Sequence, residues 1–357
     1  MFRVALTGDF LHETRGNPAV DVGLGLLDSE PRILYHFIED HAPRQGDPGW
    51  FNRLYSLEVT PEHIAEIDGL VVLRPWVKRS TFARGAQNLV VIGRSGAGYD
   101  KIDLDACTEN DVAVFNCPEA LTHSTASSAL LLMLALAKRL MQQERITRGG
   151  RWDLQPAIMG AELHGRTLGI IGLGRSGREL VRLVTPFAMR IVAHSPSADP
   201  AQAQAMGVRL VSLDQLLRDS DFVTLHCRLT DQTRRRIGAA ELARMKPTAY
   251  LVNVARGELI DEVALIEALQ RRAIAGAALD VFEVEPLPRG HPLTELDNVI
   301  LTPHYLPATA DIWAATGRVT SQGMIRAAHG QVPQNIINTD VLSRPGFRQK
   351  LARFAAG

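Results

Sequence analysis

The sequence predicts an α/β fold made of two doubly wound domains, each built on a parallel β-sheet. Short runs rich in Val, Ile and Leu alternate with longer amphipathic stretches through most of the chain, which is typical of parallel sheets covered by helices. The length of 357 residues exceeds what one compact core usually holds. Hydrophobic residues make up 46% of the chain and charged residues 22%, so the composition is that of a globular protein rather than a disordered or fibrous one.

The first third of the chain contains the pattern of one small α/β domain. Apolar runs predict strands at 3–7, 69–73, 89–92 and 112–115. Helices are predicted to begin near Pro61 and Asp103. Residues 9–52 are rich in turn formers, and the sequence does not place their elements.

The remainder of the chain carries a second and clearer series of elements. A very apolar stretch predicts a long, mostly buried helix at 125–141. Six apolar runs then predict a complete nucleotide-binding type of sheet, with helices such as 177–187 and 262–271 between the strands. The strands are expected at 167–172, 190–193, 222–225, 249–253, 276–279 and 299–301.

A further long helix is predicted at 310–329, and it indicates that the chain returns to the first domain. We therefore expect one domain from residues 1–117 together with 309–357, which would bind the substrate. The other domain is expected from residues 118–308 and would bind a dinucleotide.

Charge and cysteine content narrow the class of partner. The 39 basic residues balance the 39 acidic ones, so the chain lacks the positive field that nonspecific nucleic-acid binding requires, and no nucleic-acid partner is expected. Cys107, Cys117 and Cys227 are an odd number at no metal-like spacing. This favours a reducing, cytoplasmic location without disulfides or a metal site.

No membrane partner is expected either. The N-terminus begins with a strand-and-turn pattern and lacks the basic and apolar regions of a secretion signal. The longest strongly apolar run, 129–137, is about half of the roughly 18 residues that a membrane-spanning helix needs.

A glycine-rich turn carries the strongest local motif. Gly172, Gly174 and Gly177 follow an apolar strand and open a predicted helix, with Arg175 and Ser176 between them. Residues without side chains allow a tight turn, close approach of the backbone to a pyrophosphate, and close packing of helix on strand. The helix N-terminus adds amide donors and a positive dipole end, so a dinucleotide site is predicted here.

The sequence leaves the coenzyme open between NAD and NADP. An acidic residue at the end of the second strand usually holds the adenosine ribose of NAD. Here the run 190–193 is followed by His194 and Ser195, with no carboxylate before Asp199. The missing charge admits the 2′-phosphate of NADP, whereas Ser195 and Ser197 could instead hold the ribose of NAD.

Three ionisable residues follow the ends of three predicted strands: Arg256, Glu285 and His304. Open α/β sheets bind ligands outside the carboxyl ends of their strands, so we expect these side chains to converge on one site. Singly, an Arg or a Glu is usually a surface residue, and a lone His is usually packed or capped. Because each of the three follows a successive predicted strand, a shared functional role is favoured.

From about residue 69 to 317 the sequence resembles the D-isomer-specific 2-hydroxyacid dehydrogenases, a family that includes phosphoglycerate, glycerate and D-lactate dehydrogenases. The matching pieces are the run 94–103, the glycine turn, the run 220–227, and Met245-Lys246-Pro247 leading to Arg256. The resemblance implies a Rossmann dinucleotide-binding domain and a smaller flavodoxin-like substrate domain. It also implies NAD(P)-dependent interconversion of a 2-oxo acid and a D-2-hydroxy acid, in a homodimer with residues 148–162 as an arm.

The resemblance further implies roles for individual residues. Arg256 would bind and polarise the 2-oxo acid, His304 would be the acid/base, and Glu285 would be its partner. The substrate contacts would be Ser95, Gly96, Ala97, Gly98 and Arg74, with the loop amides receiving the substrate carboxylate. The coenzyme contacts would be Gly172, Gly174, Arg175, Ser176, Gly177, Ser195, Cys227, Arg228, Thr233, Ala255 and Asp280, the last near the nicotinamide carboxamide.

The proposed chemistry needs these residue types. Hydride transfer to a carbonyl carbon leaves charge on the oxygen, so a proton donor that works near neutrality, here His304, must stand beside it. A carboxylate at Glu285 would fix the imidazole tautomer and favour its protonated form. A forked guanidinium at Arg256 would grip the carboxylate and carbonyl oxygens of the substrate.

Two departures from the family pattern bear on specificity. Tyr305-Leu306-Pro307 follows His304 where smaller residues are usual, which implies a bulkier wall near the substrate. Arg228 stands where Pro is usual, and it is either a contact for a 2′-phosphate or an exposed Arg at a strand end.

Two alternative functions remain open at the level of sequence. One is a formate- or phosphite-type dehydrogenase, although formate chemistry is disfavoured because the resembling enzymes carry an amide at the position of Glu285. The other is a dinucleotide-sensing scaffold of the same fold, which binds coenzyme without turnover.

Overall fold

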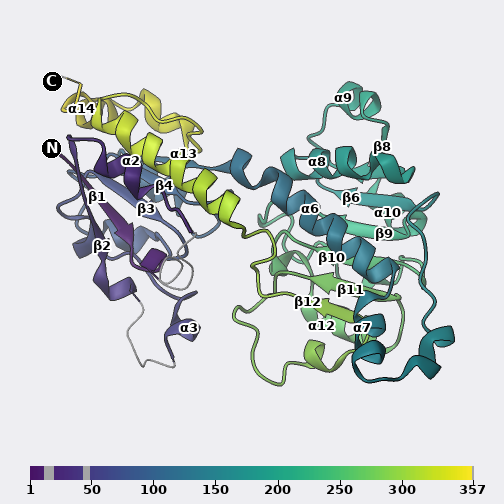
Figure 1. Ribbon diagram of the computed structural model, residues 1–357. Coiled ribbons are helices and arrows are strands. Elements are labelled where there is room, and N and C mark those ends of the chain that lie inside the picture. The colour runs from purple at the N-terminus through teal and green to yellow at the C-terminus, as the bar shows by residue number, and fades with distance from the viewer. Residues whose placement is uncertain (12–19, 43–48, 356–357) are drawn as a thin grey trace. The chain divides into compact units, whose positions relative to one another are not determined.

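The computed structural model describes residues 1–11, 20–42 and 49–355 of the chain, and these form two compact units (Figure 1). One unit comprises Met1–Leu121 together with Ala308–Gly357, and the other comprises Thr122–Pro307.

The first unit is built on a five-stranded parallel sheet with the order β2-β1-β3-β4-β5. This is the flavodoxin-like order that the family resemblance implied. Strand β2 lies in the stretch for which no element was placed, and it pairs with β1 at the sheet edge. The strands are β1 (Phe2–Thr7), β2 (Ile33–Ile38), β3 (Gly69–Val72), β4 (Val91–Arg94) and β5 (Ala113–Asn116).

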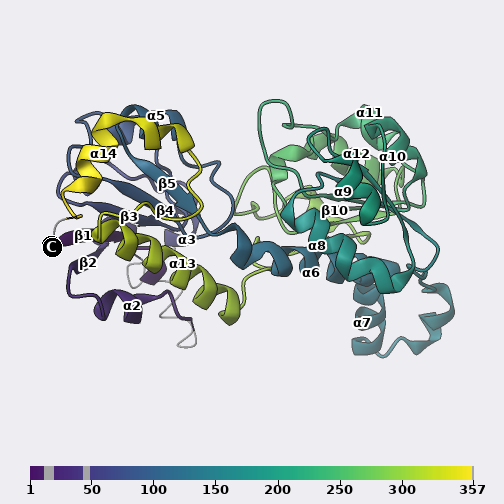
Figure 2. The ribbon, with the colours of Figure 1, turned by 90° about the horizontal axis from the view of Figure 1, so that it is seen from above.

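Helices cover both faces of this sheet. On one face α13 packs Trp313 and Met324 into a core with Val71, while on the other Cys107 of α5 packs into a core with Leu70 (Figures 1 and 2). The α-helices are α2 (Leu24–Asp28), α3 (Trp50–Arg53), α4 (Pro61–Ile64), α5 (Leu104–Glu109), α13 (Ala310–Ala328) and α14 (Pro345–Ala352). The 3-10 helices are η1 (Glu39–His41), η2 (Arg79–Phe82) and η7 (Thr339–Ser343).

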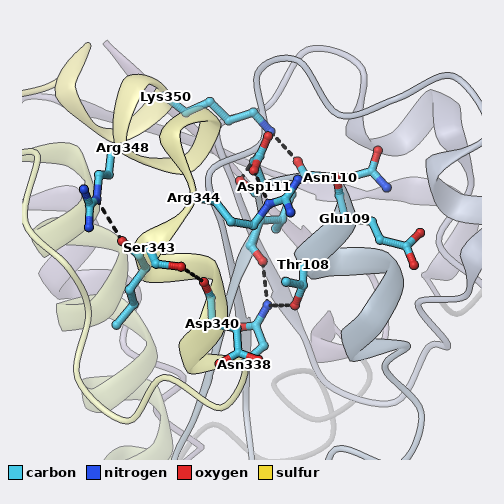
Figure 3. Close-up of polar contacts among 12 residues, drawn as sticks. Thr108, Glu109, Asn110, Asp111, Asn338, Asp340, Ser343, Arg344, Arg348 and Lys350 are labelled. Atoms are coloured by element: carbon cyan, nitrogen blue, oxygen red, sulfur yellow. Dashed lines mark hydrogen bonds and ion pairs between the residues drawn. The ribbon is translucent and has the colours of Figure 1, made fainter.

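Polar contacts join the C-terminal segment to the loop between α5 and β5 (Figure 3). Nε of Arg344 donates to Oδ1 of Asp111 at 2.5 Å. Nζ of Lys350 donates to the carbonyl oxygen of Asn110 at 2.7 Å, and burial lowers the pKa of this amine to about 8. The side-chain amide of Asn338 bonds to backbone groups beside and within β5. These contacts show why the C-terminal segment belongs to the first unit.

The second unit is built on a seven-stranded parallel sheet with the order β12-β11-β10-β9-β6-β7-β8. Read from β8, this is the Rossmann order with one further strand, and it confirms the predicted fold. Six of the strands lie where the sequence placed them, whereas the three-residue β8 was missed. The strands are β6 (Thr167–Ile171), β7 (Arg190–His194), β8 (Val208–Leu210), β9 (Phe222–Leu225), β10 (Tyr250–Asn253), β11 (Gly276–Leu279) and β12 (Val299–Leu301).

Helices cover both faces of this sheet (Figure 2), and each face carries a separate apolar core. Helices α6 and α8 pack on one face, and α10, α11 and α12 pack on the other. The α-helices are α6 (Pro118–Ala137), α7 (Leu140–Arg148), α8 (Arg175–Val184), α9 (Pro200–Ala205), α10 (Leu213–Asp219), α11 (Ala239–Leu242) and α12 (Glu262–Gln270). The 3-10 helices are η3 (Trp152–Ala157), η4 (Thr185–Phe187), η5 (Gly257–Leu259) and η6 (Pro292–Glu295).

The single helix predicted at 125–141 is wrong, because α6 and α7 are separate helices. Arg139 has a left-handed φ of 51°, which a continuing helix does not allow. The carbonyl oxygen of Ala137 accepts a hydrogen bond from the backbone N–H of Ala161 at 2.7 Å. The carbonyl oxygen at the last residue of α6 is therefore bonded to a distant segment and not to a further turn of the same helix.

By length and composition alone, α6 is also apolar enough to cross a membrane, and it is the one such helix in the described part of the chain. Half of its most apolar window is buried inside the protein. Ala129, Leu132 and Met133 lie in the core that faces β6, which is the environment of a core helix.

Candidate active site at the carboxyl ends of the second sheet

Arg256 is positioned by the buried side chain of Asn253, the last residue of β10. Oδ1 of Asn253 accepts from the backbone N–H of Ala255 at 3.0 Å, and Nδ2 donates to the carbonyl oxygen of Arg256 at 2.8 Å. Asn253 is fully buried, so this turn is tied to the sheet. Arg256 itself is extended, with φ −146° and ψ 141°, immediately before η5.

Gly257 lets the segment that carries Arg256 lie directly against the segment after β11. A Cβ atom at this position would be 1.9 Å from the carbonyl carbon of Phe282 and 2.0 Å from its oxygen. Both groups belong to backbone, which cannot swing aside as a flexible side chain does. The glycine therefore brings Arg256 close to the loop that carries Glu285.

Replacing Gly257 with Ala is expected to destabilise the chain by about 1–3 kcal/mol or more, because the added methyl group overpacks rigid backbone. Urea unfolding followed by circular dichroism measures this change. Gly25→Ala is the matched control, since a Cβ there meets no atom within 4 Å, and it should change stability by less than about 1 kcal/mol. Equal unfolding midpoints for the two variants would contradict the close approach at Gly257.

Glu285 and His304 form a hydrogen-bonded pair. Nδ1 of His304 lies 2.8 Å from Oε2 of Glu285, and Oε1 of Glu285 accepts from the backbone N–H of Phe282 at 3.1 Å. Burial alone would raise the pKa of Glu285, but the hydrogen bond and charge of His304, the Phe282 amide and the charge of Arg256 together hold it below its usual value. The carboxylate is therefore ionised and fixed by two donors.

His304 is held in an unusual backbone conformation, with φ 52°. Non-glycine residues with such angles carry strain and gather at functional sites. With Nδ1 committed to Glu285, Nε2 makes no hydrogen bond to the described part of the chain. The imidazole is 36% exposed, so Nε2 is available to a ligand.

Asp280 follows β11, and one of its carboxylate oxygens has no partner in the part of the chain that the structure describes. Oδ1 accepts from Oγ1 of Thr302 at 2.6 Å and from the backbone N–H of Tyr305 at 3.3 Å. Oδ2 is buried and has no hydrogen-bond partner within the described residues. Burial raises the pKa of this carboxyl despite the hydrogen bond from Thr302. An unpaired buried acceptor fits an amide N–H donor, such as the carboxamide of a nicotinamide ring.

The glycine turn follows β6, with Gly174 as the N-cap of α8. Gly172 has φ 96°, and a Cβ there would be 2.5 Å from the backbone nitrogen of Cys227, so both its angles and its surroundings require glycine. A Cβ at Gly174 would meet no atom within 4 Å, so the turn is open on this side. The glycine turn and the N-terminus of α8 together fit the pyrophosphate of a dinucleotide.

A half-buried histidine, His226, supports this turn. Nδ1 of His226 lies 3.1 Å from Oγ of Ser176, and Nε2 lies 3.2 Å from Oγ1 of Thr224. Burial lowers the pKa of His226 to about 4, so the ring is neutral at physiological pH. Ser176 is therefore part of the glycine turn and also contacts His226, which directly follows β9.

The other predicted coenzyme residues lie at the neighbouring strand ends. Ser195 is half-buried directly after β7, and Cys227 and Arg228 follow β9. Oγ1 of Thr233 donates to the carbonyl oxygen of Arg228 at 2.7 Å and accepts from the backbone N–H of Thr230 at 2.7 Å. Thr233 therefore shapes the loop after β9.

The predicted substrate loop, residues 95–98, lies in the first unit, after β4. The carbonyl oxygen of Ala97 accepts from Nδ2 of Asn116 at 2.6 Å, and that of Gly96 accepts from a backbone N–H. The backbone N–H groups of Ala97 and Gly98 donate to none of the residues that the structure describes. Two adjacent amides of this kind offer hydrogen-bond donors to an anion.

Arg74 follows β3 in the same unit and is tied to a buried carboxylate. Its backbone N–H donates to Oδ2 of Asp9 at 3.0 Å, and its Nη1 lies 3.8 Å from the same oxygen. Burial raises the pKa of Asp9, and the positive charge of Arg74 opposes the rise.

The structure thus brings Arg256, Glu285 and His304 together at one edge of the second sheet. Sequence reasoning missed the residues that position them, Asn253 and Gly257, although both flank Arg256 in the sequence. It also missed Thr302, which orients Asp280. Within the described ranges, no group of three or more His, Cys, Asp and Glu side chains could hold a metal ion.

Comparison with known proteins shows the class to which this fold and site belong. The NAD-binding domain of the D-isomer-specific 2-hydroxyacid dehydrogenases matches residues 130–305. A glyoxylate reductase of Korarchaeum cryptofilum is 38% identical over 298 residues, which cover 82% of this chain and 90% of that protein. The chain therefore belongs to the D-isomer-specific 2-hydroxyacid dehydrogenase family and is an NAD(P)-dependent oxidoreductase acting on CH–OH groups.

Other relatives are named for more than one enzymatic activity. A D-3-phosphoglycerate dehydrogenase of Methanocaldococcus jannaschii is 42% identical over 278 residues, which cover 78% of this chain but only 53% of that protein. The chain thus matches about half the length of that relative. The crystal structure of a glyoxylate reductase from Paecilomyes thermophila has a TM-score of 0.77 and 27% identity, and it covers 94% of this chain and 98% of that one.

Proposed function

We propose that this enzyme reduces a small 2-oxo acid to the D-2-hydroxy acid, with His304, Glu285 and Arg256 as its catalytic residues. The observation that carries the proposal is the pair of His304 and Glu285, joined at 2.8 Å with Nε2 of the imidazole left available. Arg256 supports it, because its charge acts on Glu285 and therefore lies close to the pair.

His304 supplies the proton in this mechanism. When bound, the reduced nicotinamide supplies a hydride to the carbonyl carbon, and negative charge then develops on the carbonyl oxygen. Protonated Nε2 of His304 donates to that oxygen, while Glu285 holds Nδ1 and stabilises the imidazolium. Arg256 binds the oxygens of the 2-oxo acid and stabilises the developing charge.

The chain offers a contact for each part of the coenzyme. The turn with Gly172, Gly174 and Gly177 would hold the pyrophosphate at the N-terminus of α8. Oδ2 of Asp280 would accept from the carboxamide N–H. The residues assigned to the adenosine side and the nearby walls are Arg175, Ser176, Ser195, Cys227, Arg228, Thr233 and Ala255.

The substrate class is a short 2-oxo acid such as glyoxylate. Relatives across the greater part of this chain are named glyoxylate reductases. Tyr305, directly after His304, narrows the space for a side chain on the substrate. In the first unit, the amides of Ala97 and Gly98 together with Arg74 are the proposed carboxylate contacts.

Activity measured with a panel of substrates tests the proposal. Oxidation of NADH and of NADPH is followed with glyoxylate, hydroxypyruvate, pyruvate and a bulkier branched 2-oxo acid, and reduction of NAD+ and of NADP+ is followed with formate. We expect turnover that is highest with glyoxylate or hydroxypyruvate. Coenzyme that binds without turnover on any 2-oxo acid would replace the proposal with a dinucleotide-sensing scaffold, and turnover of formate alone would replace it with a formate dehydrogenase.

Replacing Glu285 with Gln is expected to move the alkaline decline of 2-oxo acid reduction to lower pH, by about one pH unit or more, because protonated His304 loses its charge partner. Rates measured from pH 5 to 10 give this shift. The pKa of Glu285 lies below its ordinary 4.5, so its ionised form and the stability that it contributes are complete above pH 4.5 and are lost as pH falls through the lowered value.

Glu30→Gln is the matched control for this prediction. Glu30 pairs with His329 at 3.1 Å, and its exposure of 15% and that of His329, 37%, resemble the 17% and 36% of Glu285 and His304. A pH profile that moves equally in both variants, or in neither, would contradict the role of Glu285.

We further propose that the enzyme is a cytoplasmic homodimer and that the segment 148–162 contributes to the dimer contact. Trp152 and Met159 support this, because their side chains are 63% and 79% exposed. The first unit is the proposed substrate domain and the second is the proposed coenzyme domain. Sedimentation equilibrium measures the oligomeric state.

A further inference from the structure

An arginine outside the predicted site is held at the carboxyl end of β7. Nη2 of Arg236 lies 3.2 Å from Nε2 of His194, the last residue of that strand. Nδ1 of the same ring lies 3.2 Å from the carbonyl oxygen of Val211, which can only accept a hydrogen bond. Nδ1 therefore carries the proton and Nε2 accepts from Arg236. The imidazole ring therefore holds the guanidinium in place but does not balance its positive charge.

Within the ranges that the structure describes, the positive charge of Arg236 has no acidic partner. No carboxylate within the described part of the chain forms an ion pair with it, whereas the adjacent Arg235 pairs with Glu283 at 2.9 Å. Arg236 also acts on Cys227, where burial raises the pKa of the thiol and the positive charge opposes the rise. The guanidinium of Arg236, which has no ion-pair partner among the described residues, therefore lies near both His194, at the end of β7, and Cys227, just after β9.

This place is beside the glycine turn. In the sheet, β7 and β9 flank β6, and the turn with Gly172 follows β6. The strand order reverses between β6 and β9, where open α/β sheets bind their ligands. Residues after β7 face the adenosine ribose in this arrangement.

The same end of β7 lacks the carboxylate that would repel a phosphate. Ser195 and Ser197 follow His194, and the first acidic residue is Asp199. Oδ1 of Asp199 is engaged by the backbone N–H of Ala201 at 3.0 Å, as the N-cap of α9. The ribose side of the site therefore combines hydroxyl groups with the guanidinium of Arg236, which forms no ion pair within the described residues.

We propose that Arg236, together with the hydroxyl group of Ser195, binds the 2′-phosphate of NADP(H), so that the enzyme prefers NADPH to NADH. This inference rests on the proposed coenzyme position at the glycine turn. A guanidinium presents forked donors that match a phosphate, and phosphate supplies the negative charge that the surrounding residues do not. NADH offers no such group. The assignment selects Arg236 over Arg228 as the phosphate-binding residue.

Direct binding tests the inference without turnover. Isothermal titration calorimetry measures Kd for NADPH, NADH, adenosine 2′,5′-bisphosphate and AMP with the unchanged chain and with the Arg236→Met variant, which keeps an apolar stem. We expect the unchanged chain to bind the bisphosphate and NADPH at least about tenfold more tightly than AMP and NADH. Arg236→Met should reduce this preference by about 10- to 100-fold, as expected for the loss of a charge-assisted hydrogen bond, and should leave the Kd for NADH within about threefold.

Two matched variants localise the effect. Arg234→Met removes an exposed arginine from the same segment and should leave the preference unchanged. Arg228→Ala tests the competing arginine after β9 and should also leave it unchanged. Equal affinity for the bisphosphate and AMP, a preference that survives Arg236→Met, or one that is lost instead in Arg228→Ala would each overturn the inference. Selective binding of the bisphosphate in a chain that reduces no 2-oxo acid would support Arg236 while refuting the catalytic proposal.

Discussion

Replacing His304 with Gln is expected to lower kcat for 2-oxo acid reduction by about 10²- to 10⁴-fold, because the amide cannot donate a proton to the developing alkoxide. The affinity for coenzyme should change little, since the substituted group faces the substrate oxygen. Steady-state rates with glyoxylate at saturating NADPH or NADH measure kcat, and calorimetry measures coenzyme binding.

His329→Gln is the matched control for this loss. Nε2 of His329 lies 3.1 Å from Oε2 of Glu30, so the control removes an imidazole with a similar carboxylate partner and similar exposure from the first unit. The control should retain near-parental kcat. A His304→Gln variant that also retained it would assign the proton donor to another group.

Replacing Arg256 with Lys is expected to lower kcat/KM for 2-oxo acids by about 10²- to 10³-fold. Lysine keeps the charge but presents a point donor instead of a planar fork, so it cannot hold two substrate oxygens in fixed geometry. The carboxylate of Glu285 also loses the guanidinium that helps to hold its pKa low. Initial rates over a range of glyoxylate concentrations separate the effects on kcat and KM.

Arg244→Lys serves as the control for Arg256→Lys. Arg244 forms ion pairs with Asp214 at 3.2 Å and with Glu241 at 3.1 Å, and it lies in the segment that joins α11 to the amino end of β10. We expect its kcat/KM to stay within about twofold of the parent, as for surface ion pairs that contribute little. Near-parental kcat/KM for Arg256→Lys across the substrate panel would remove Arg256 from the catalytic machinery.

The order of the local elements could be read directly from the sequence. The strands at 222–225, 276–279 and 299–301 were placed correctly, because an apolar run of this length between turn formers is a local property. The turn at Gly172 could be recognised for the same reason, since a left-handed φ favours glycine wherever it occurs. The parallel order of both sheets follows from the βα alternation that these elements share.

Contacts between distant residues decided what the sequence left open. Strand β8 has three residues and β2 lies at a sheet edge, so neither has the continuous apolar pattern of a central strand. At the break between α6 and α7, the carbonyl oxygen of Ala137 accepts a hydrogen bond from the backbone N–H of Ala161. Such contacts depend on packing and leave no periodic trace in the chain.

The same division holds within the candidate site. Arg256, Glu285 and His304 could be selected from the sequence, because each follows a predicted strand and parallel strands end at one edge. The tertiary structure alone decided that Nδ1 of His304 meets Glu285 and that Arg236 reaches His194 across 42 positions of sequence. It alone also decided that Oδ2 of Asp280 has no hydrogen-bond partner among the described residues. Residue types and short spacings therefore determine the chemistry available to this chain, whereas hydrogen-bond partners and burial, which arise only when distant segments pack, determine how that chemistry is directed.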